Sequence, residues 1–157
     1  MAHLPEPVFR AVLEATPLVS IDLCLRRPDG RYLLGWRNNR PAARHWFVPG
    51  GRIRKNETIA AAFARLTEGE LGCRFSLDQA RLLGAFDHLY EDTVFGDTPY
   101  GTHYVVLAHR LDLPGDFEPR ADDQHSDLAW RTPQEILVDP EVHANTKAYF
   151  PQVEQLG

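Results

Sequence analysis

The sequence predicts a single α/β domain, because helical and strand patterns share one chain of modest length. A chain of 157 residues, 43% of them hydrophobic, can bury one core and is short for two. Residues 18–25 alternate apolar and polar side chains, as a half-buried strand does. Residues 56–72 repeat their apolar side chains at helical spacing instead. We therefore expect residues 1–157 to form one domain.

Composition argues against several classes of protein. The net charge of −5 is unlike the basic balance of a general nucleic-acid binder, so an anionic substrate needs locally concentrated cations. Cys24 and Cys73 are too few for a disulfide framework or a metal cluster. No apolar run approaches the roughly 20 residues that span a bilayer, and residues 1–5 lack the features of a signal peptide. We expect a cytoplasmic protein that binds neither nucleic acid nor a membrane.

The first part of the chain predicts a helix and a β-hairpin. Residues 5–15 favour a short helix. The strand at residues 18–25 places Asp22 on its polar face, where a solvated carboxylate at a sheet edge is the alternative to a functional role. A turn signal at residues 28–30 then returns the chain as a second arm over residues 31–37.

The stretch from residue 46 to residue 72 carries most of the chemistry. Residues 46–49 indicate a short buried strand that runs into Gly50 and Gly51, where paired glycines allow a turn and a close approach to a ligand. A helix follows, with Asn56 as its predicted cap and Gly72 as its end. Glu70 continues the apolar face of this helix, so its carboxylate needs a cation, a hydrogen-bond donor or a metal ion. This combination suits a hard metal ion that holds phosphate oxygens.

The second half of the chain predicts further strands and helices. We expect one strand that starts with residues 82–86 and two more at residues 102–113 and 127–131. Helices are expected at residues 133–138 and 140–150.

Candidate ligand-binding side chains flank two loops between these elements. His88 and Tyr104 lie on either side of the loop at residues 91–101, and a structural hydrogen-bonding role for His88 is equally open. Gln124 and His125 are adjacent in the next polar loop. A loop histidine beside acidic residues is often only a solvated side chain, and that alternative stays open for His125.

Three arginines are candidates for binding phosphate. Arg37 ends the second hairpin arm, Arg52 follows the glycine pair and Arg65 lies in the predicted helix. A guanidinium group can bind two phosphate oxygens at once. If the three side chains converge, they form an anion site; a lone arginine at a strand end is usually a solvated charge.

The stretch at residues 46–72 resembles the Nudix box, G-x5-E-x7-R-E-U-x-E-E-x-G-U, where U is a bulky apolar residue. The residues that match at the right spacing are Gly51, Glu57, Arg65, Glu70 and Gly72. Two positions depart, because Leu66 and Gly69 stand where the family has glutamates. The variant RLTxxELG, with WFVPGGR upstream, resembles the GDP-mannose mannosyl hydrolases, and the similarity extends from Thr16 to Phe150.

The resemblance implies a mixed β-sheet between helices (α/β/α), with the box as a loop-helix-loop that lines the active site. It implies one Mg²⁺ per active site, with Mn²⁺ as an alternative, held by the Gly50 carbonyl, Glu70 and Gln124. His125 would be the general base, with Asp22 orienting the sugar or balancing the charge of Arg37. The groups expected to bind substrate are Arg37, Arg52, Arg65, Tyr104, His88 and Asp22, and the three arginines and Asp22 are also expected to assist catalysis.

The function that this resemblance implies is hydrolysis of GDP-mannose, or of GDP-glucose, to GDP and the free sugar, with inversion at the anomeric carbon. The alternatives are a Nudix pyrophosphohydrolase that attacks phosphorus and a non-catalytic nucleotide-binding module. Loss of carboxylates at Leu66 and Gly69 counts against the first alternative, and retention of Glu70, Gln124 and His125 counts against the second. A homodimer is also implied. The sequence does not choose the guanine contact among Phe86, Tyr90, Phe95 and Tyr100.

Overall fold

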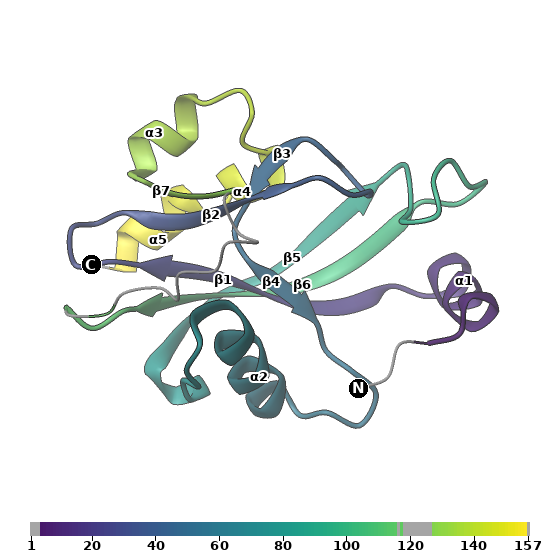
Figure 1. Ribbon diagram of the computed structural model, residues 1–157, viewed down its shortest axis with the longest axis horizontal. Coiled ribbons are helices and arrows are strands. Elements are labelled where there is room, and N and C mark those ends of the chain that lie inside the picture. The colour runs from purple at the N-terminus through teal and green to yellow at the C-terminus, as the bar shows by residue number, and fades with distance from the viewer. Residues whose placement is uncertain (1–3, 116, 118–126, 157) are drawn as a thin grey trace.

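A mixed sheet runs through the molecule with helices on both faces, as the computed structural model shows for residues 4–115, 117 and 127–156 (Figure 1). Helix α2 covers one face, and α3, α4 and α5 lie on the other. The strands are β1 (Leu18–Arg26), β2 (Tyr32–Arg37), β3 (His45–Phe47), β4 (Gly50–Arg52), β5 (Ala80–Tyr90), β6 (Thr102–Asp112) and β7 (Leu128–Arg131). The helices are α1 (Glu6–Ala15), α2 (Ile59–Leu71), α3 (Pro133–Val138), α4 (Ala144–Lys147) and α5 (Phe150–Val153), with short 3₁₀ turns at Leu77–Gln79 and Glu154–Leu156. The predicted α/β fold with a mixed sheet between helices is confirmed.

Strand β1 is the centre of the sheet. The main strand order is β3-β2-β1-β6-β5, with β4 paired to β1 and β7 paired to β2. β1 runs parallel to β6 and antiparallel to β2 and β4. Its Ile21 and Leu23 side chains are buried on the α2 face, while Cys24 is buried on the α5 face. Because β1 is an interior strand, the alternative of Asp22 as a carboxylate at a sheet edge is wrong.

The glycine pair is part of a strand, not a turn as its composition suggested. Gly50, Gly51 and Arg52 form β4 and pair with Asp22, Ile21 and Ser20 of β1. A Cβ atom at Gly50 would overlap the Ile21 carbonyl oxygen, and one at Gly51 would overlap the Leu66 side chain. The glycines are therefore needed for the close approach of β4 to both β1 and α2.

Helix α2 begins later than its sequence suggested. The Ala61 N–H donates to the Thr58 hydroxyl at 3.0 Å, so Thr58 is the cap, and the prediction of Asn56 was wrong. Asn56 has a φ of 67° and belongs to the preceding turn. The predicted end is confirmed, because Gly72 follows α2 with a φ of 80° in the left-handed region.

The C-terminal helix predicted at residues 140–150 is instead two short helices, α4 and α5. The backbone before α4 is extended because it pairs with β3: the Trp46 N–H donates to the Glu141 carbonyl, and the His143 N–H donates to the Trp46 carbonyl. His143 then caps α4, accepting from the Asn145 N–H at 3.0 Å. None of the helices in the described residues is long and apolar enough to cross a bilayer.

Candidate active site

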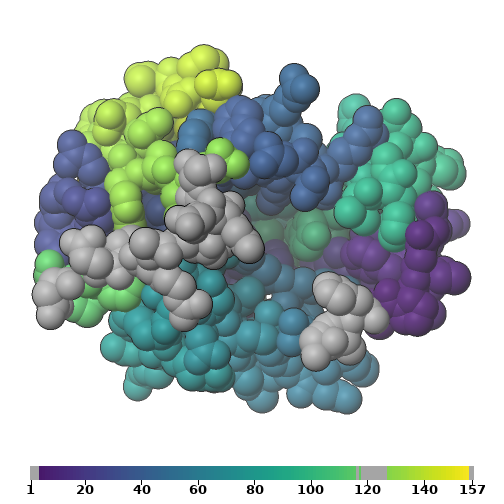
Figure 2. All heavy atoms as spheres, in the orientation of Figure 1, coloured from purple at the N-terminus to yellow at the C-terminus, as the bar shows by residue number. Residues whose placement is uncertain are grey.

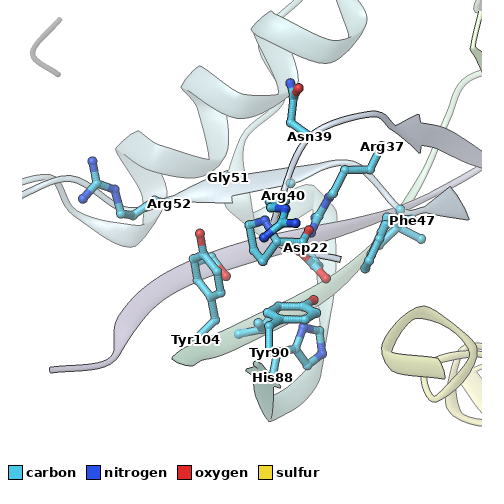
Figure 3. Close-up of a pocket in the computed structure, with 15 residues that line it drawn as sticks. Asp22, Arg37, Asn39, Arg40, Phe47, Gly51, Arg52, His88, Tyr90 and Tyr104 are labelled. Atoms are coloured by element: carbon cyan, nitrogen blue, oxygen red, sulfur yellow. The ribbon is translucent and has the colours of Figure 1, made fainter. Parts of the chain in front are cut away.

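A cavity of about 280 Å³ lies over β1 and β6, walled by β2, β4 and β5 (Figure 3). The molecular surface is hollowed near its centre, and green atoms, the colour of β6, form the floor (Figure 2). Arg52 and Tyr104 lie at one end of the cavity, and Phe47 lies at the other. The polar and aromatic residues that line it are Ser20, Asp22, Arg37, Asn39, Arg40, Phe47, Arg52, His88, Tyr90 and Tyr104. Five residues predicted to bind substrate thus lie together.

A second cavity of about 380 Å³ adjoins the first and shares Arg37, Phe47 and Gly50 with it. Its lining adds two carboxylates, Glu70 from α2 and Asp127 before β7. Gly50 and Glu70, two of the predicted metal ligands, therefore face one space.

The donors around this second cavity suit a hard divalent cation. The Glu70 carboxylate and the Gly50 carbonyl are oxygen donors of the kind that Mg²⁺ and Mn²⁺ prefer. No group of three or more His, Cys, Asp or Glu side chains that could hold a metal ion occurs in the part of the chain that the structure describes. The predicted third ligand, Gln124, and the predicted base, His125, lie outside the described residues.

Arg37 is held by aromatic and backbone contacts. Its guanidinium carbon lies 3.8 Å from the centroid of the Phe47 ring, and Nη1 donates to the Pro41 carbonyl at 3.0 Å. The Phe47 ring also stacks on His143, with centroids 4.8 Å apart. Arg52 lies across the cavity, with its guanidinium carbon 5.1 Å from the ring of Phe9 in α1. Both arginines are thus placed by aromatic faces.

Arg65 does not line either cavity. It binds Glu57 through two hydrogen bonds, Nε to Oε2 at 2.7 Å and Nη2 to Oε1 at 2.9 Å. Nη2 also donates to the Arg52 carbonyl at 2.8 Å. The three arginines therefore do not converge, and the contacts of Arg65 hold the loop before α2 against β4. The cavity instead contains Arg40, which the sequence did not single out and which pairs with Asp97 at 3.1 Å.

A hydrogen-bonded group of three side chains lies at the floor of the first cavity. The Tyr149 hydroxyl donates to Asp22 Oδ2 at 2.6 Å and lies 3.2 Å from His88 Nε2. Burial raises the pKa of Asp22 to about 6, opposed by the Tyr149 hydrogen bond and the charge of Arg37. Burial also lowers the pKa of His88 to about 4, with further lowering by His143 and Arg37. At neutral pH the cavity therefore faces an ionised Asp22 and a neutral His88.

Sequence reasoning did not identify Tyr149 or Asp127. Tyr149 lies far from Asp22 in the chain, and the sequence marks it only as the neighbour of another aromatic residue, Phe150. Among the four aromatic residues proposed for the guanine base, the cavity lining includes Tyr90. Phe86 instead packs on Tyr149, and Phe95 packs on Phe9.

Comparison with known proteins agrees with this architecture. The family description NUDIX domain matches residues 16–153. The low-salt glycan biosynthesis protein Agl8 of Haloferax volcanii is 39% identical over 126 residues, which cover 80% of this chain and 78% of that protein.

Solved structures show the same fold. A MutT NUDIX hydrolase from Burkholderia pseudomallei superposes with a TM-score of 0.66 at 29% identity, over 88% of this chain and 98% of that one. The NUDIX domain of Shewanella oneidensis NrtR, complexed with ADP ribose, gives a TM-score of 0.65 at 18% identity, over 98% of this chain and 100% of that one. At that identity the second likeness concerns the fold alone.

Proposed function

Because the chain belongs to the Nudix family of hydrolases, we propose that it hydrolyses GDP-mannose, or a closely related GDP-hexose, to GDP and the free sugar. The observation that carries the proposal is the pairing of two adjoining cavities. One holds Arg37 and Arg52 together with Asp22 and His88, and the other holds Glu70. A diphosphate joined to a hexose needs cationic groups for its phosphates and hydrogen-bonding groups for its hydroxyls. The first cavity contains both kinds of group, and the second adds a carboxylate that can hold a metal ion. The glycan biosynthesis role named for the Haloferax relative is consistent with a nucleotide-sugar substrate.

The arginines supply the diphosphate site. The chain as a whole carries a net charge of −5, so cations concentrated at one cavity are a local arrangement for an anion. Arg37 and Arg52 keep their guanidinium groups against Phe47 and Phe9, which limits the rotamer entropy that is lost on binding. As the anomeric carbon–oxygen bond breaks, these charges stabilise the negative charge that develops on the departing diphosphate.

Nudix enzymes generally use a divalent metal ion such as Mg²⁺, and this chain has residues that fit one. Glu70 and Gly50 line one cavity. We assign the Glu70 carboxylate and the Gly50 carbonyl as ligands of a single Mg²⁺, or of Mn²⁺ in its place. Gln124 is proposed as a further ligand. The bound cation supplies Lewis-acid stabilisation of the diphosphate.

The departures from the family pattern favour attack at carbon. Neither Leu66 nor Gly69 has a carboxylate, although the family has glutamates at these two positions. Leu66 instead packs against Gly51, and Gly69 is exposed on α2. With fewer acidic ligands than usual, a site for several cations around phosphorus is not expected. His125 is the proposed base, because a neutral imidazole can take a proton from the attacking water. A single displacement with this base inverts the anomeric centre.

Hydrolysis of GDP-mannose in oxygen-18 water tests the proposal. Label in mannose is the expected result, because water attacks the anomeric carbon. Label in a phosphate product would show a pyrophosphohydrolase, and GDP binding without turnover would show a nucleotide-binding module. GDP-glucose in parallel tests whether the hydroxyl configuration matters. The same resemblance leads us to propose a homodimer, which sedimentation equilibrium tests directly.

A further inference from the structure

We propose that Tyr149 is a positioning residue that holds Asp22 and His88 as one hydrogen-bonded unit at the floor of the first cavity, where the sugar would bind. The inference rests on the proposed function and adds to it a residue that does not line the cavity. Tyr149 is fully buried, with 0% of its surface exposed, just before α5. Its role would be to bring the C-terminal segment into the active site through a single hydroxyl.

The sheet geometry explains why such a bridge is needed. Asp22 lies on β1 and His88 on β5, and β6 runs between these strands. Adjacent strands are about 4.8 Å apart, so the backbones of β1 and β5 are separated by about 10 Å. The Tyr149 hydroxyl spans this gap, 2.6 Å from Asp22 Oδ2 and 3.2 Å from His88 Nε2.

The ring of Tyr149 is itself held in place. Phe86 meets it edge-on with centroids 4.9 Å apart, and the His88 ring lies tilted against it at 5.9 Å. The surrounding apolar cluster also includes Phe150, Val153 and Ile136. A hydroxyl on a ring packed in this way has little freedom to move, so both of its hydrogen-bond partners are oriented.

A count of protons gives His88 one tautomer. A carboxylate can only accept hydrogen bonds, so the single Tyr149 hydroxyl proton goes to ionised Asp22. The contact with His88 then requires Nε2–H to donate to the Tyr149 oxygen. His88 Nδ1 is left as the ring's acceptor, which suits it to receive a hydrogen bond from a sugar hydroxyl.

The tautomer can be measured without substrate. Long-range proton–nitrogen-15 spectra of the imidazoles at about pH 8, well above the ordinary pKa of histidine, should show His88 protonated at Nε2, with assignment from a His88→Gln variant. Tyr149→Phe should convert this signal to a mixture of tautomers. Tyr32→Phe is the matched control, since Tyr32 is also fully buried in the same cluster but its hydroxyl faces Glu154 at 3.4 Å. A His88 protonated at Nδ1 in the unaltered protein would overturn the proposal, whether or not the variant folds.

Turnover tests the positioning role itself. Tyr149→Phe should lower kcat for GDP-mannose about 10- to 100-fold, since small displacements of oriented groups carry such costs. Its affinity for GDP should change less than about twofold, because Arg37 and Arg52 are untouched. Tyr32→Phe should keep its kcat. Equal kcat in the two variants would refute the positioning role. If the unaltered protein does not hydrolyse GDP-mannose, the proposed function fails, and the His88 spectra alone then decide whether Tyr149 orients the pair.

Discussion

The guanidinium carbon of Arg37 lies 3.8 Å from the centre of the Phe47 ring, whose plane is nearly parallel to that of His143 behind it. A cation over an aromatic face is attracted by about 0.5–2 kcal/mol, depending on how much water is excluded. Here the attraction also serves geometry, because a long and flexible side chain is held beside the cavity before any ligand arrives. β2 supplies Arg37, which lies opposite His45 of the antiparallel β3, and β3 supplies Phe47 two residues further along. His143 comes from the start of α4.

Phe47→Leu should therefore weaken GDP binding about two- to fivefold, because it keeps the apolar bulk but removes the π face under Arg37. Isothermal titration calorimetry measures the affinity, and thermal unfolding checks the fold. Phe75→Leu is the control, because the two side chains are similarly buried: Phe75 is 8% exposed and Phe47 is 6% exposed. The ring of Phe75 contacts Phe117 and lines neither cavity. If both variants bind GDP with the same affinity, the stack does not place Arg37.

The ion pair of Glu57 and Arg65 should appear in the pH dependence of stability. Arg65 holds the pKa of Glu57 at about 2, below its ordinary 4.5. A depressed acid pKa stabilises the folded state fully above the unfolded value and loses that contribution as pH falls through the folded value. The difference in unfolding free energy between the unaltered protein and Glu57→Gln should thus be constant above about pH 5 and shrink towards pH 2.

Urea denaturation across this pH range measures that difference. Glu6→Gln is the matched control, because Glu6 forms an exposed pair with Arg10, and such pairs contribute little. A pH-independent effect of Glu57→Gln would show that Arg65 does not bind the Glu57 carboxylate in solution.

Glu70→Gln should weaken or abolish the metal dependence of turnover, because it removes a charged donor from the second cavity. Activity is followed while Mg²⁺ or Mn²⁺ is titrated. Glu68→Gln changes the same side chain on the same helix, but Glu68 is exposed and pairs with Arg74, so its titration should match that of the unaltered protein. Identical titrations for both variants would place the cation elsewhere.

His125→Leu should lower turnover by roughly 10² to 10⁴ while GDP and metal still bind, if His125 is the base. His103→Leu is a suitable control, since His103 lines neither cavity and lies 3.7 Å from Asp87. Single-turnover rates separate the chemical step from product release. A near-normal rate for His125→Leu would remove His125 from this role.

The sequence predicted most elements because their signals are local. The alternation along residues 18–25, the turn at residues 28–30 and the glycine at the end of α2 each depend on a few neighbouring residues. The cap of α2 was misplaced by only two residues, from Thr58 to Asn56. The two larger errors were decided by a distant partner. Gly50 and Gly51 form a strand because β1 pairs with them, and residues 141–143 are extended because β3 pairs with them.

The candidate site divides in the same way. Asp22 was identified from its position on a strand, and His88 and Tyr104 from their places on either side of a loop. Strand registry places all three around one cavity. The direction of a long side chain is not local, so the sequence could not show that Arg65 turns to Glu57 instead. Nor could it show that Tyr149, over a hundred positions from Asp22, would supply its hydrogen bond.

Two glycines around α2 should respond oppositely to the same substitution. Gly51→Ala places a methyl group against Leu66 and should lower stability by about 1–3 kcal/mol, since overpacking forces neighbouring side chains to shift. Gly69 lies within α2 with open space around it, so Gly69→Ala should raise stability by about 0.5–1 kcal/mol through helix propensity. Chemical denaturation of both variants measures the pair, each serving as the other's control. A destabilising Gly69→Ala would mean that this face of α2 is covered in solution, and the proposed dimer interface would be the first surface to examine there.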